Sequence, residues 1–304
     1  MFTLRPDREE SAALACQMLA NSLDAGLTPQ QLGLPPGAGA DSPLAALLAK
    51  QRVVLRPAER VALEAGWRSG RGPQSLLLLA SARQRRADAS RDLGSGLGYP
   101  LALSLTTWAV ALLLLSVGRP TGSPWVLVLV PGAALAALLL ALRAVATASG
   151  PAMRVPPVRD LAEEVAELPY LEALLALYAA GEPLLQAHPA ALSATASPGL
   201  RERLQRADAF LQGNVPIAEA LDQASALRPD TRMLLRTAEH SGQLEQALER
   251  LVVARGESIR RRSKTLAKRL AGLCYLAAVV TAVHLIFSFY GAQFEALRSL
   301  RTGR

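Results

Sequence analysis

Three long runs of the sequence carry no charged residue: residues 99–117, 125–142 and 270–289. Each run is 18 to 20 residues long, and an α-helix needs about 20 apolar residues to cross the roughly 30 Å hydrocarbon core of a bilayer. Buried helices of soluble proteins are usually shorter and are interrupted by polar positions. The runs therefore predict three transmembrane helices, and the rest of the chain has to be organised around them.

The composition agrees with a membrane protein. Of the 304 residues 51% are hydrophobic, and the mean hydropathy is +0.22, which is too apolar for an ordinary soluble domain. The first 45 residues carry acidic and basic side chains where a signal peptide would have its apolar segment. We therefore expect no cleavable signal, and we expect the N-terminus to stay on the side of synthesis.

The net charge of +8 is distributed by position along the chain. Lysine and arginine gather at the cytoplasmic ends of membrane spans, and the loop between the first two runs has only Arg119. This pattern predicts that both long polar segments are cytoplasmic and that the C-terminal tail is outside, although Arg298, Arg301 and Arg304 in the tail count against that placement. The basic residues before the first run are Arg83, Arg85, Arg86 and Arg91, and those before the third are Arg260, Arg261, Arg262, Lys264, Lys268 and Arg269.

The basic segment 258–269, SIRRRSKTLAKR, could also be taken for a nucleic-acid-binding patch. No aromatic residue lies among its charges, no nucleic-acid-binding fold motif accompanies it, and an apolar run follows at once. Attraction to anionic lipid head groups, about 1 kcal/mol per basic residue near the surface, explains the segment. We therefore expect membrane lipids as partners and no nucleic acid.

An internal repeat divides the polar part of the chain. Residues 227–251 align without a gap to residues 55–79, and ten of the 25 positions are identical, including an Arg-Pro pair and a Ser-Gly pair. This similarity predicts an internal duplication. The predicted organisation is a first cytoplasmic domain at 1–98, a transmembrane hairpin at 99–143, a second cytoplasmic domain at 144–269, a third span at 270–289 and a tail at 290–304.

The repeat has the pattern of a pair of helices. Pro229 and Asp230 suit a first helical turn, and Gly242 suits the stop. From Leu244 onward, apolar residues recur at helical spacing (Leu244, Ala247, Leu248, Leu251 and Val252). Gly26 and Gly181 similarly suit the ends of earlier helices, and no stretch alternates as a half-buried strand does. The predicted fold class is all-α, with two duplicated helical-bundle cytoplasmic domains and three transmembrane helices.

Three spaced motifs carry a family resemblance. Residues 168–269 contain, in order, LEALLALYAAGEPLLQA, LQGNVPIAEAL and MLLRTAEHSGQLEQALERLVVARGESIRRR. This succession resembles the type II secretion system F domain of inner-membrane platform proteins, which occur in secretion and type IV pilus machines. The matching motif positions are Gly181, Pro183 and Leu184, then Gly213, Glu219, Ala220 and Leu221, and finally Glu239, Ser241, Gly242 and Leu244.

The resemblance implies a six-helix-bundle cytoplasmic domain and a protein of the bacterial inner membrane without catalysis. Such a protein links a cytoplasmic hexameric ATPase to pilin or pseudopilin subunits, and we also expect contacts with other inner-membrane assembly components and a homo-oligomer. Ala238 stands where the family usually has glycine. In the first copy Ser69 and Gly70 are the repeat equivalents and Gly66 keeps that glycine, but Trp67 replaces the glutamate, so this copy is diverged and shortened.

The candidate partner-contact residues come from these motifs: Glu239, Ser241, Gly242, Leu244, Gly181, Gly213 and Glu219. Glu239 is the sharpest of them, because a carboxylate beside a Ser-Gly helix break can contact a basic partner surface. In the alternative, Ser241 caps the following helix and Glu239 lies on a solvated face. The sequence favours neither.

The sequence predicts no catalytic residue, cofactor or metal. The phosphate-loop pattern G-x-x-x-x-G-K-[ST] is absent, and the glycine-rich stretch 94–98 precedes a membrane span without a strand before it. The histidines and cysteines (His188, His240, His284, Cys16 and Cys274) are dispersed, which disfavours a zinc site and a disulfide. His284 lies inside the third run, where it is either packed as a neutral side chain or takes part in a proton step.

Two classes of function remain open. In the first, the protein is a non-enzymatic platform of a pilus-like export machine. In the second, it is a small transporter or channel subunit, which would place paired polar groups and helix-breaking residues at mid-membrane depth. Only Pro131 and Gly132 fit the second class, and a kink explains them as well.

Overall fold

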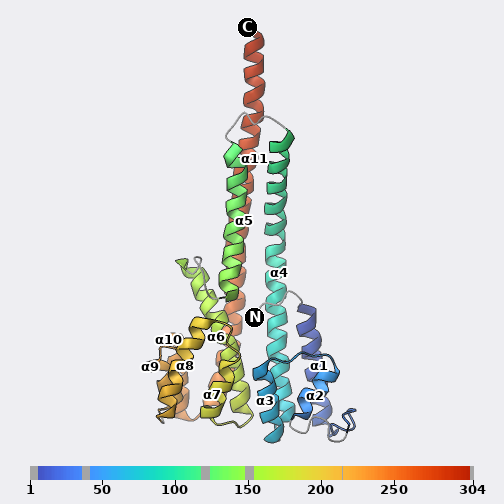
Figure 1. Cartoon of the computed structure of the whole chain (residues 1–304), viewed down its shortest axis with the longest axis vertical. Coiled ribbons are helices and arrows are strands. Elements are labelled where there is room, and N and C mark those ends of the chain that lie inside the picture. The colour runs from blue at the N-terminus through green and yellow to red at the C-terminus, as the bar shows by residue number, and fades with distance from the viewer. Residues whose placement is uncertain (1–5, 36–41, 118–123, 148–153, 214, 302–304) are drawn as a thin grey trace.

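The chain folds as an all-α protein in the computed structural model (Figure 1). The structure describes residues 6–35, 42–117, 124–147, 154–213 and 215–301. Over these ranges every regular element is a helix, as predicted. In chain order the α-helices are α1 Pro6–Asp24, α2 Pro43–Lys50, α3 Pro57–Arg68, α4 Gly72–Val117, α5 Pro124–Thr147, α6 Pro156–Ala179, α7 Leu184–Leu192, α8 Pro198–Gln212, α9 Ile217–Gln223, α10 Pro229–Ser241 and α11 Leu244–Arg301.

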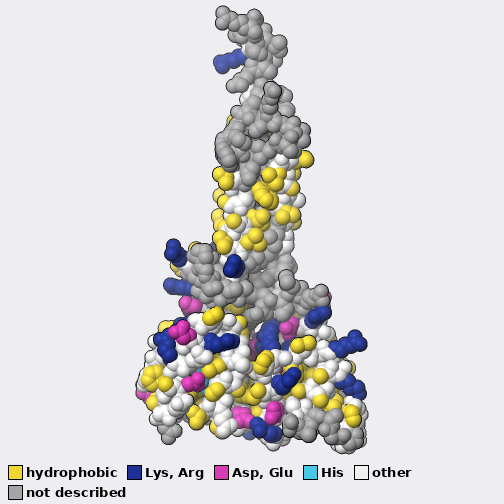
Figure 2. All heavy atoms as spheres, in the orientation of Figure 1, with side chains coloured by type: hydrophobic (Ala, Val, Ile, Leu, Met, Phe, Trp, Pro, Cys, Tyr) yellow, Lys and Arg dark blue, Asp and Glu magenta, His cyan; other side chains and the backbone are white. Residues whose placement is uncertain are grey.

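The molecule has a broad end and a long stalk (Figure 1). The short helices gather at the broad end, and α4, α5 and α11 run side by side to form the stalk. Large apolar side chains are exposed along the stalk, among them Leu105, Leu129 and Phe287 (Figure 2). Such a surface is unfavourable in water and suits a lipid environment.

One described helix is long and apolar enough to cross a membrane, the segment Leu244–His284 of α11. A shorter apolar helix, Leu129–Ala141, lies within α5. Spans at 99–117 and 125–142 stay predictions, as does their number. Within α5, Pro131 is buried, and Gly132 leaves room for the indole of Trp108, whose Nε1 lies 3.7 Å from where a Cβ would be. Helix packing accounts for this pair without a transport role.

The long helices join the two parts of the molecule without a break. The predicted domain boundaries at residues 98 and 269 fall inside α4 and α11. The glycine-rich stretch 94–98 is likewise helical, so it does not form a phosphate-binding loop. A continuous helix transmits displacement and torsion along its axis, whereas a flexible linker would absorb them.

The repeat has the same local geometry in both copies. In the first copy α3 ends at Arg68, Gly70 has φ +75°, and α4 begins at Gly72. In the second copy α10 ends at Ser241, Gly242 has φ +71°, and α11 begins at Leu244. Both short helices start with proline in the first turn. The predicted helix, Ser-Gly turn and second helix are therefore present in both stretches.

We expect Gly242→Val to destabilise the second domain by about 1 kcal/mol or more, because a β-branched residue is strained at positive φ. A Cβ at Gly242 would meet nothing within 4 Å, so the effect isolates the backbone. Urea unfolding of the detergent-solubilised chain measures it. Gly199→Val is the control, since Gly199 is helical and equally open. Equal stabilities of the two variants would contradict the strain argument.

Each copy has its own apolar core. The core of the first domain joins α1 to α4 around Leu44, Leu48, Leu63 and Leu76. The larger core of the second domain centres on α6 and extends through α7 to α11. Ala58 of α3 also belongs to this second core, so α3 packs on the second domain, and α4 contacts α6 and α11 as well.

The helices before the repeat also correspond in pairs. Gly26 after α1 and Gly181 after α6 have φ of +85° and +90° and close their helices with the same backbone hydrogen bonds, at an offset of 155. Arg52 after α2 and Ser225 after α9 both have positive φ, at an offset of 173. Between α1 and α2 the described residues include no helix that could match α7 or α8. The first domain is thus the shorter bundle.

Candidate functional site

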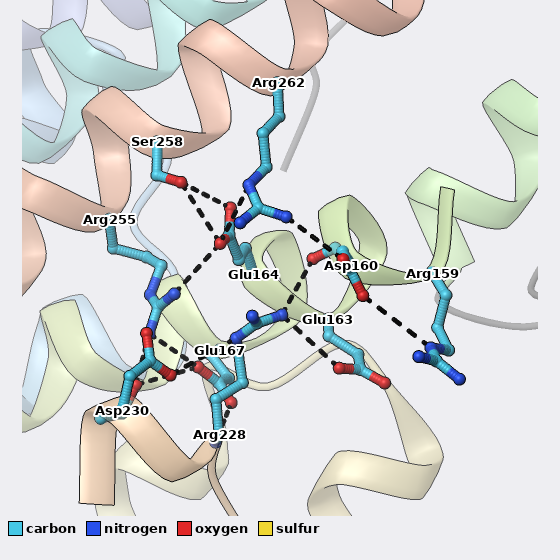
Figure 3. Close-up of polar contacts among 11 residues, drawn as sticks. Arg159, Asp160, Glu163, Glu164, Glu167, Arg228, Asp230, Arg255, Ser258 and Arg262 are labelled. Atoms are coloured by element: carbon cyan, nitrogen blue, oxygen red, sulfur yellow. Dashed lines mark hydrogen bonds and ion pairs between the residues drawn. The ribbon is translucent and has the colours of Figure 1, made fainter. Parts of the chain in front are cut away.

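An ionic cluster with a buried centre fastens the base of α11 to the second domain (Figure 3). The guanidinium of Arg255 on α11 lies 3.1 Å from a carboxylate oxygen of Glu164 and 3.7 Å from one of Glu167, both on α6. It also lies 3.1 Å from Asp230 on α10. We call this cluster the second joint; its members are Asp160, Glu163, Glu164, Glu167, Arg228, Asp230, Arg255, Ser258 and Arg262.

Further contacts tie α11 to α6. The hydroxyl of Ser258 donates to Glu164 at 3.0 Å, and Arg262 lies 3.4 Å from both Glu164 and Asp160. Arg255, Ser258 and Arg262 follow one another at i, i+3 and i+7, so they lie on one face of α11. Three successive turns of α11 are therefore bound to the acidic face of α6.

Arg228 completes the second joint from the N-terminus of α10. Its backbone N–H donates to Glu167 at 2.6 Å, and its guanidinium lies 3.7 Å from Glu163 and 3.5 Å from Asp230. The side chain of Glu167 thus satisfies a backbone donor that the start of a helix leaves without an intrahelical partner.

Burial makes the second joint electrostatically strong. Glu164, Glu167 and Arg255 are all buried, and a buried charge is tolerated only when it is paired and hydrogen-bonded. Burial raises the pKa of Glu167 to about 7, against the opposing effect of the Arg228 N–H. Burial also acts to raise the pKa of Asp230, but Arg255 and Arg228 outweigh it and hold that pKa below its usual value.

The raised pKa of Glu167 predicts that stability falls with pH. The folded state binds a proton that the unfolded state has already released above pH 4.5, so the free energy of unfolding decreases between pH 4.5 and about 7. We expect Glu167→Gln to flatten this part of the profile, measured as the unfolding midpoint at each pH. Glu163→Gln, at a more exposed carboxylate of the same helix, is the control. Parallel profiles for wild type and Glu167→Gln would rule out this assignment.

A similar cluster, the first joint, fastens α4 to the first domain. Arg83 on α4 lies 3.3 Å from Glu9 on α1 and 2.5 Å from Glu59 on α3, and it donates to the carbonyl of Val54 at 2.8 Å. All three charged side chains are buried. We define the first joint as Glu9, Arg56, Glu59, Arg83 and Arg86.

Arg86 connects the first joint to the second domain. It lies 2.9 Å from Glu59 and 2.7 Å from Glu172 on α6, and both of these carboxylates are buried. Arg85 also reaches Glu172, at 3.3 Å. A buried ion pair between α4 and α6 therefore holds the two domains together.

The two joints occupy corresponding positions. Arg83 and Arg255 are related by the same offset of 172 as the sequence repeat, and so are their partners Glu59 and Thr231. The acidic partners Glu9 and Glu164 are related by the offset of 155 that relates Gly26 to Gly181. The arrangement of a long helix pinned by an arginine to the preceding helices thus occurs twice.

Glu239 has a structural role that the sequence did not reveal. Its carboxylate accepts the backbone N–H groups of Ile217 at 3.0 Å and Ala218 at 2.9 Å, at the N-terminus of α9. The side chain is therefore neither on a solvated face nor free for a partner without breaking these bonds. The hydroxyl of Ser241 donates back to the carbonyl of Ala238, so its bond is to the end of α10 rather than to α11.

The other motif residues do not form one site, and each has a separate structural position. Gly181 and Gly242 end helices, and Leu244 is buried at the start of α11. Gly213 follows α8, and Glu219 is exposed in the first turn of α9. Two of the three motifs are in contact, because Glu239 of the last motif accepts a hydrogen bond from the backbone of Ile217 in the middle motif. Ser69 and Gly70 form the corresponding turn of the first domain.

The joints themselves were missed from sequence. A signal was present, because Asp160, Glu163, Glu164 and Glu167 recur at i, i+3, i+4 and i+7 on one helical face. That spacing on its own indicates a solvated acidic stripe. The packing of α10 and α11 against α6 buries Glu164 and Glu167 of this stripe, whereas Asp160 and Glu163 stay partly exposed.

The described residues hold no cluster of three or more potential metal ligands. His188 is buried on α7, where its Nδ1 lies 2.7 Å from the Tyr170 hydroxyl and its Nε2 lies 3.1 Å from the Leu204 carbonyl oxygen. Burial lowers the pKa of His188. Cys16 and Cys274 are buried as free thiols, and His284 is partly buried on α11.

Comparison with known proteins finds a similarity in the second part of the chain. Residues 170–292 match the family described as type II secretion system (T2SS), protein F. The match covers the second domain from within α6 onward, together with the apolar segment of α11. The resemblance inferred from the three motifs is thereby confirmed for these residues. No curated protein matches the chain.

Proposed function

We propose that this chain is a non-enzymatic inner-membrane platform that couples a cytoplasmic hexameric ATPase to the assembly of pilin or pseudopilin subunits. The match of residues 170–292 supports the general class, because this family consists of platform-type proteins of type II secretion and type IV pilus machines. The observation that carries the coupling role is α11, whose segment Leu244–His284 is long and apolar enough to cross a membrane and also contains the three residues that α11 contributes to the second joint.

The proposed mechanism is mechanical. On this proposal a motor that displaces the second domain also displaces α11, because Arg255, Ser258 and Arg262 bind the base of the helix to α6. The first joint does the same for α4 through Arg83, and Arg86 makes the two domains move together. No step requires a catalytic group on this chain.

The proposed function includes an internal duplication. The shared turn geometry, the paired helices and the two corresponding joints support it. On this proposal the first domain lost, or never had, the segment that forms α7 and α8. Trp67 then stands where Glu239 caps α9, and the Ser42 side chain makes no cap hydrogen bond at the corresponding helix α2.

We propose that both soluble domains are cytoplasmic, which the basic residues at the base of the stalk support. Reporter fusions at Ala45 and Ala196 test the topology in intact cells. Activity of a periplasm-specific reporter at either position would overturn it.

Binding to an ATPase tests the coupling role directly. The full-length chain in detergent should capture a P-loop ATPase encoded beside its gene and should show no nucleotide turnover of its own. A chain in which Arg86 is replaced should still bind the ATPase but should not support pilus or secretion assembly. Failure of the wild-type chain to bind, or intrinsic hydrolysis that survives removal of contaminating ATPases, would refute the proposal.

Glu239→Ala separates the structural role of this carboxylate from partner contact. We expect a loss of about 1–2 kcal/mol in stability, because two backbone donors at the start of α9 lose their acceptor. Glu245→Ala, at an exposed carboxylate in the first turn of α11, is the matched control for urea unfolding. A wild-type midpoint for Glu239→Ala would contradict the capping role.

A further inference from the structure

The first domain packs on the second through a narrow apolar face of α3. Ala58, Ala62 and Ala65 follow at i, i+4 and i+7 on this helix and are all buried. Ala58 and Ala62 line the same small cavity as Pro169 and Ala173 of α6. Small side chains on both helices allow this close approach.

The corresponding face of α10 is uncovered. At the repeat offset of 172, Ala58, Ala62 and Ala65 correspond to Asp230, Leu234 and Thr237. All three are exposed, and the side of α10 that carries them includes a leucine that is 53% accessible. This face of α10 is thus exposed at Leu234 and Thr237, while Asp230 at its start pairs with Arg255.

The corresponding face of α1 is also uncovered. At the offset of 155, Pro169 and Ala173 of α6 correspond to Leu14 and Met18. Leu14 is 55% and Met18 is 68% accessible, whereas their counterparts are buried. The acceptor face of the second domain therefore has an equivalent on the first that is apolar and exposed in the described part of the chain.

These two faces lie on opposite sides of the molecule. Figure 1 shows α10 at one side of the broad end and α1 at the other, with α6, α3 and α4 between them. It also shows α4 and α11 running in the same direction along the stalk. If a second copy packed on the first in the way that the second domain packs on the first, its long helices would therefore run in the same direction. Helices that cross one shared membrane require this.

We propose that α10 of one copy of this chain docks on α1 of a second copy, repeating between chains the packing of α3 on α6 within the chain. The contact places Leu234 of one copy against Leu14 and Met18 of the next. It joins two different surfaces, so it is head-to-tail, and successive copies close into a ring when the rotation allows.

The polar rim of the two faces is compatible with this contact. Within the chain Arg71 donates to the carbonyl of Ala179 at 2.8 Å; at the corresponding positions Gln243 would face the carbonyl of Asp24. Within the chain Arg85 pairs with Glu172. The equivalent positions on α11 and α1 are Glu257 and Gln17. Both are exposed, and the Gln17 amide can donate to the Glu257 carboxylate. No like-charged pair arises at either place.

This inference concerns a contact between two copies of the chain and not the coupling to an ATPase. The contact can therefore be measured without an ATPase. The test uses cysteine crosslinking of full-length chains in membranes. Met18→Cys and Leu234→Cys are made in separate, differently tagged copies, co-expressed and treated with a short bismaleimide. Both native cysteines are buried, so the wild-type chain serves as the background.

We expect a crosslinked product that contains both tags, and we expect none when either variant is expressed alone, because neither face meets itself. Leu185→Cys is the control partner, since Leu185 is 54% accessible on α7 and outside both faces. Absence of product from the mixed copies would overturn the proposal. So would equal crosslinking by one variant alone or by the Leu185→Cys control.

Discussion

Replacing Arg255 by methionine lowers the free energy of unfolding of the second domain by an expected 3–5 kcal/mol, about the cost of leaving a buried charge without its partner. Glu164 and Glu167 would keep their buried positions but lose the guanidinium that lies between them. Methionine fills the apolar part of the arginine side chain, so the loss measures the charge rather than a cavity.

Urea unfolding of the detergent-solubilised chain, followed by far-UV circular dichroism, measures this loss. Arg261→Met is the matched control, because Arg261 lies on the same helix with 75% of its side chain accessible and pairs only weakly with Glu257 at 3.8 Å. The control should change stability by about 0.5 kcal/mol or less. Equal midpoints for the two variants would show that the second joint does not stabilise the base of α11.

Arg86→Met should weaken the contact between the two domains by a similar 3–5 kcal/mol. The substitution leaves Glu172 with Arg85 alone and removes one of the two arginines that neutralise Glu59. We expect the domains to open at the α3–α6 contact, seen as faster proteolysis there while each bundle stays helical. In cells, the variant should support neither secretion nor pilus assembly.

Two comparisons make the Arg86 experiment specific. Arg60→Met changes an exposed arginine of the same domain and should leave proteolysis at the wild-type rate. The double variant Arg86→Met with Glu172→Met should lose less than the single variant, because an apolar pair can replace a buried ion pair. A double variant that is worse than Arg86→Met would indicate that the packing around these residues, and not the charge, holds the domains together.

Local rules predicted much of the fold. Gly26, Gly70, Gly181 and Gly242 were expected at helix ends, and all four have positive φ there. The amphipathic spacing after Leu244 predicted the buried face of α11. These features depend on residues a few positions apart, and they can be read from sequence because backbone strain and helical periodicity act over that range.

The same local rules did not predict the candidate site. The sequence drew attention to Glu239 as a partner contact, but this carboxylate binds the start of α9, which lies 21 to 22 residues away along the chain. The second joint links residues up to 102 positions apart. No local sequence pattern predicts which charged side chains will be buried together, because their burial depends on how the helices pack.

The sequence by itself determined the helices, the apolar runs, the Ser-Gly turns and the family of residues 170–292. The tertiary structure decided which charges become joints, because Arg83, Arg86 and Arg255 look like ordinary flanking charges until α4 and α11 pack against α1 and α6. It also decided that the packed faces of α3 and α6 are buried, whereas the equivalent faces of α10 and α1 are exposed. The physical reason is that an isolated charge is stable in water, whereas a buried charge requires a partner that only a distant segment of the chain can bring.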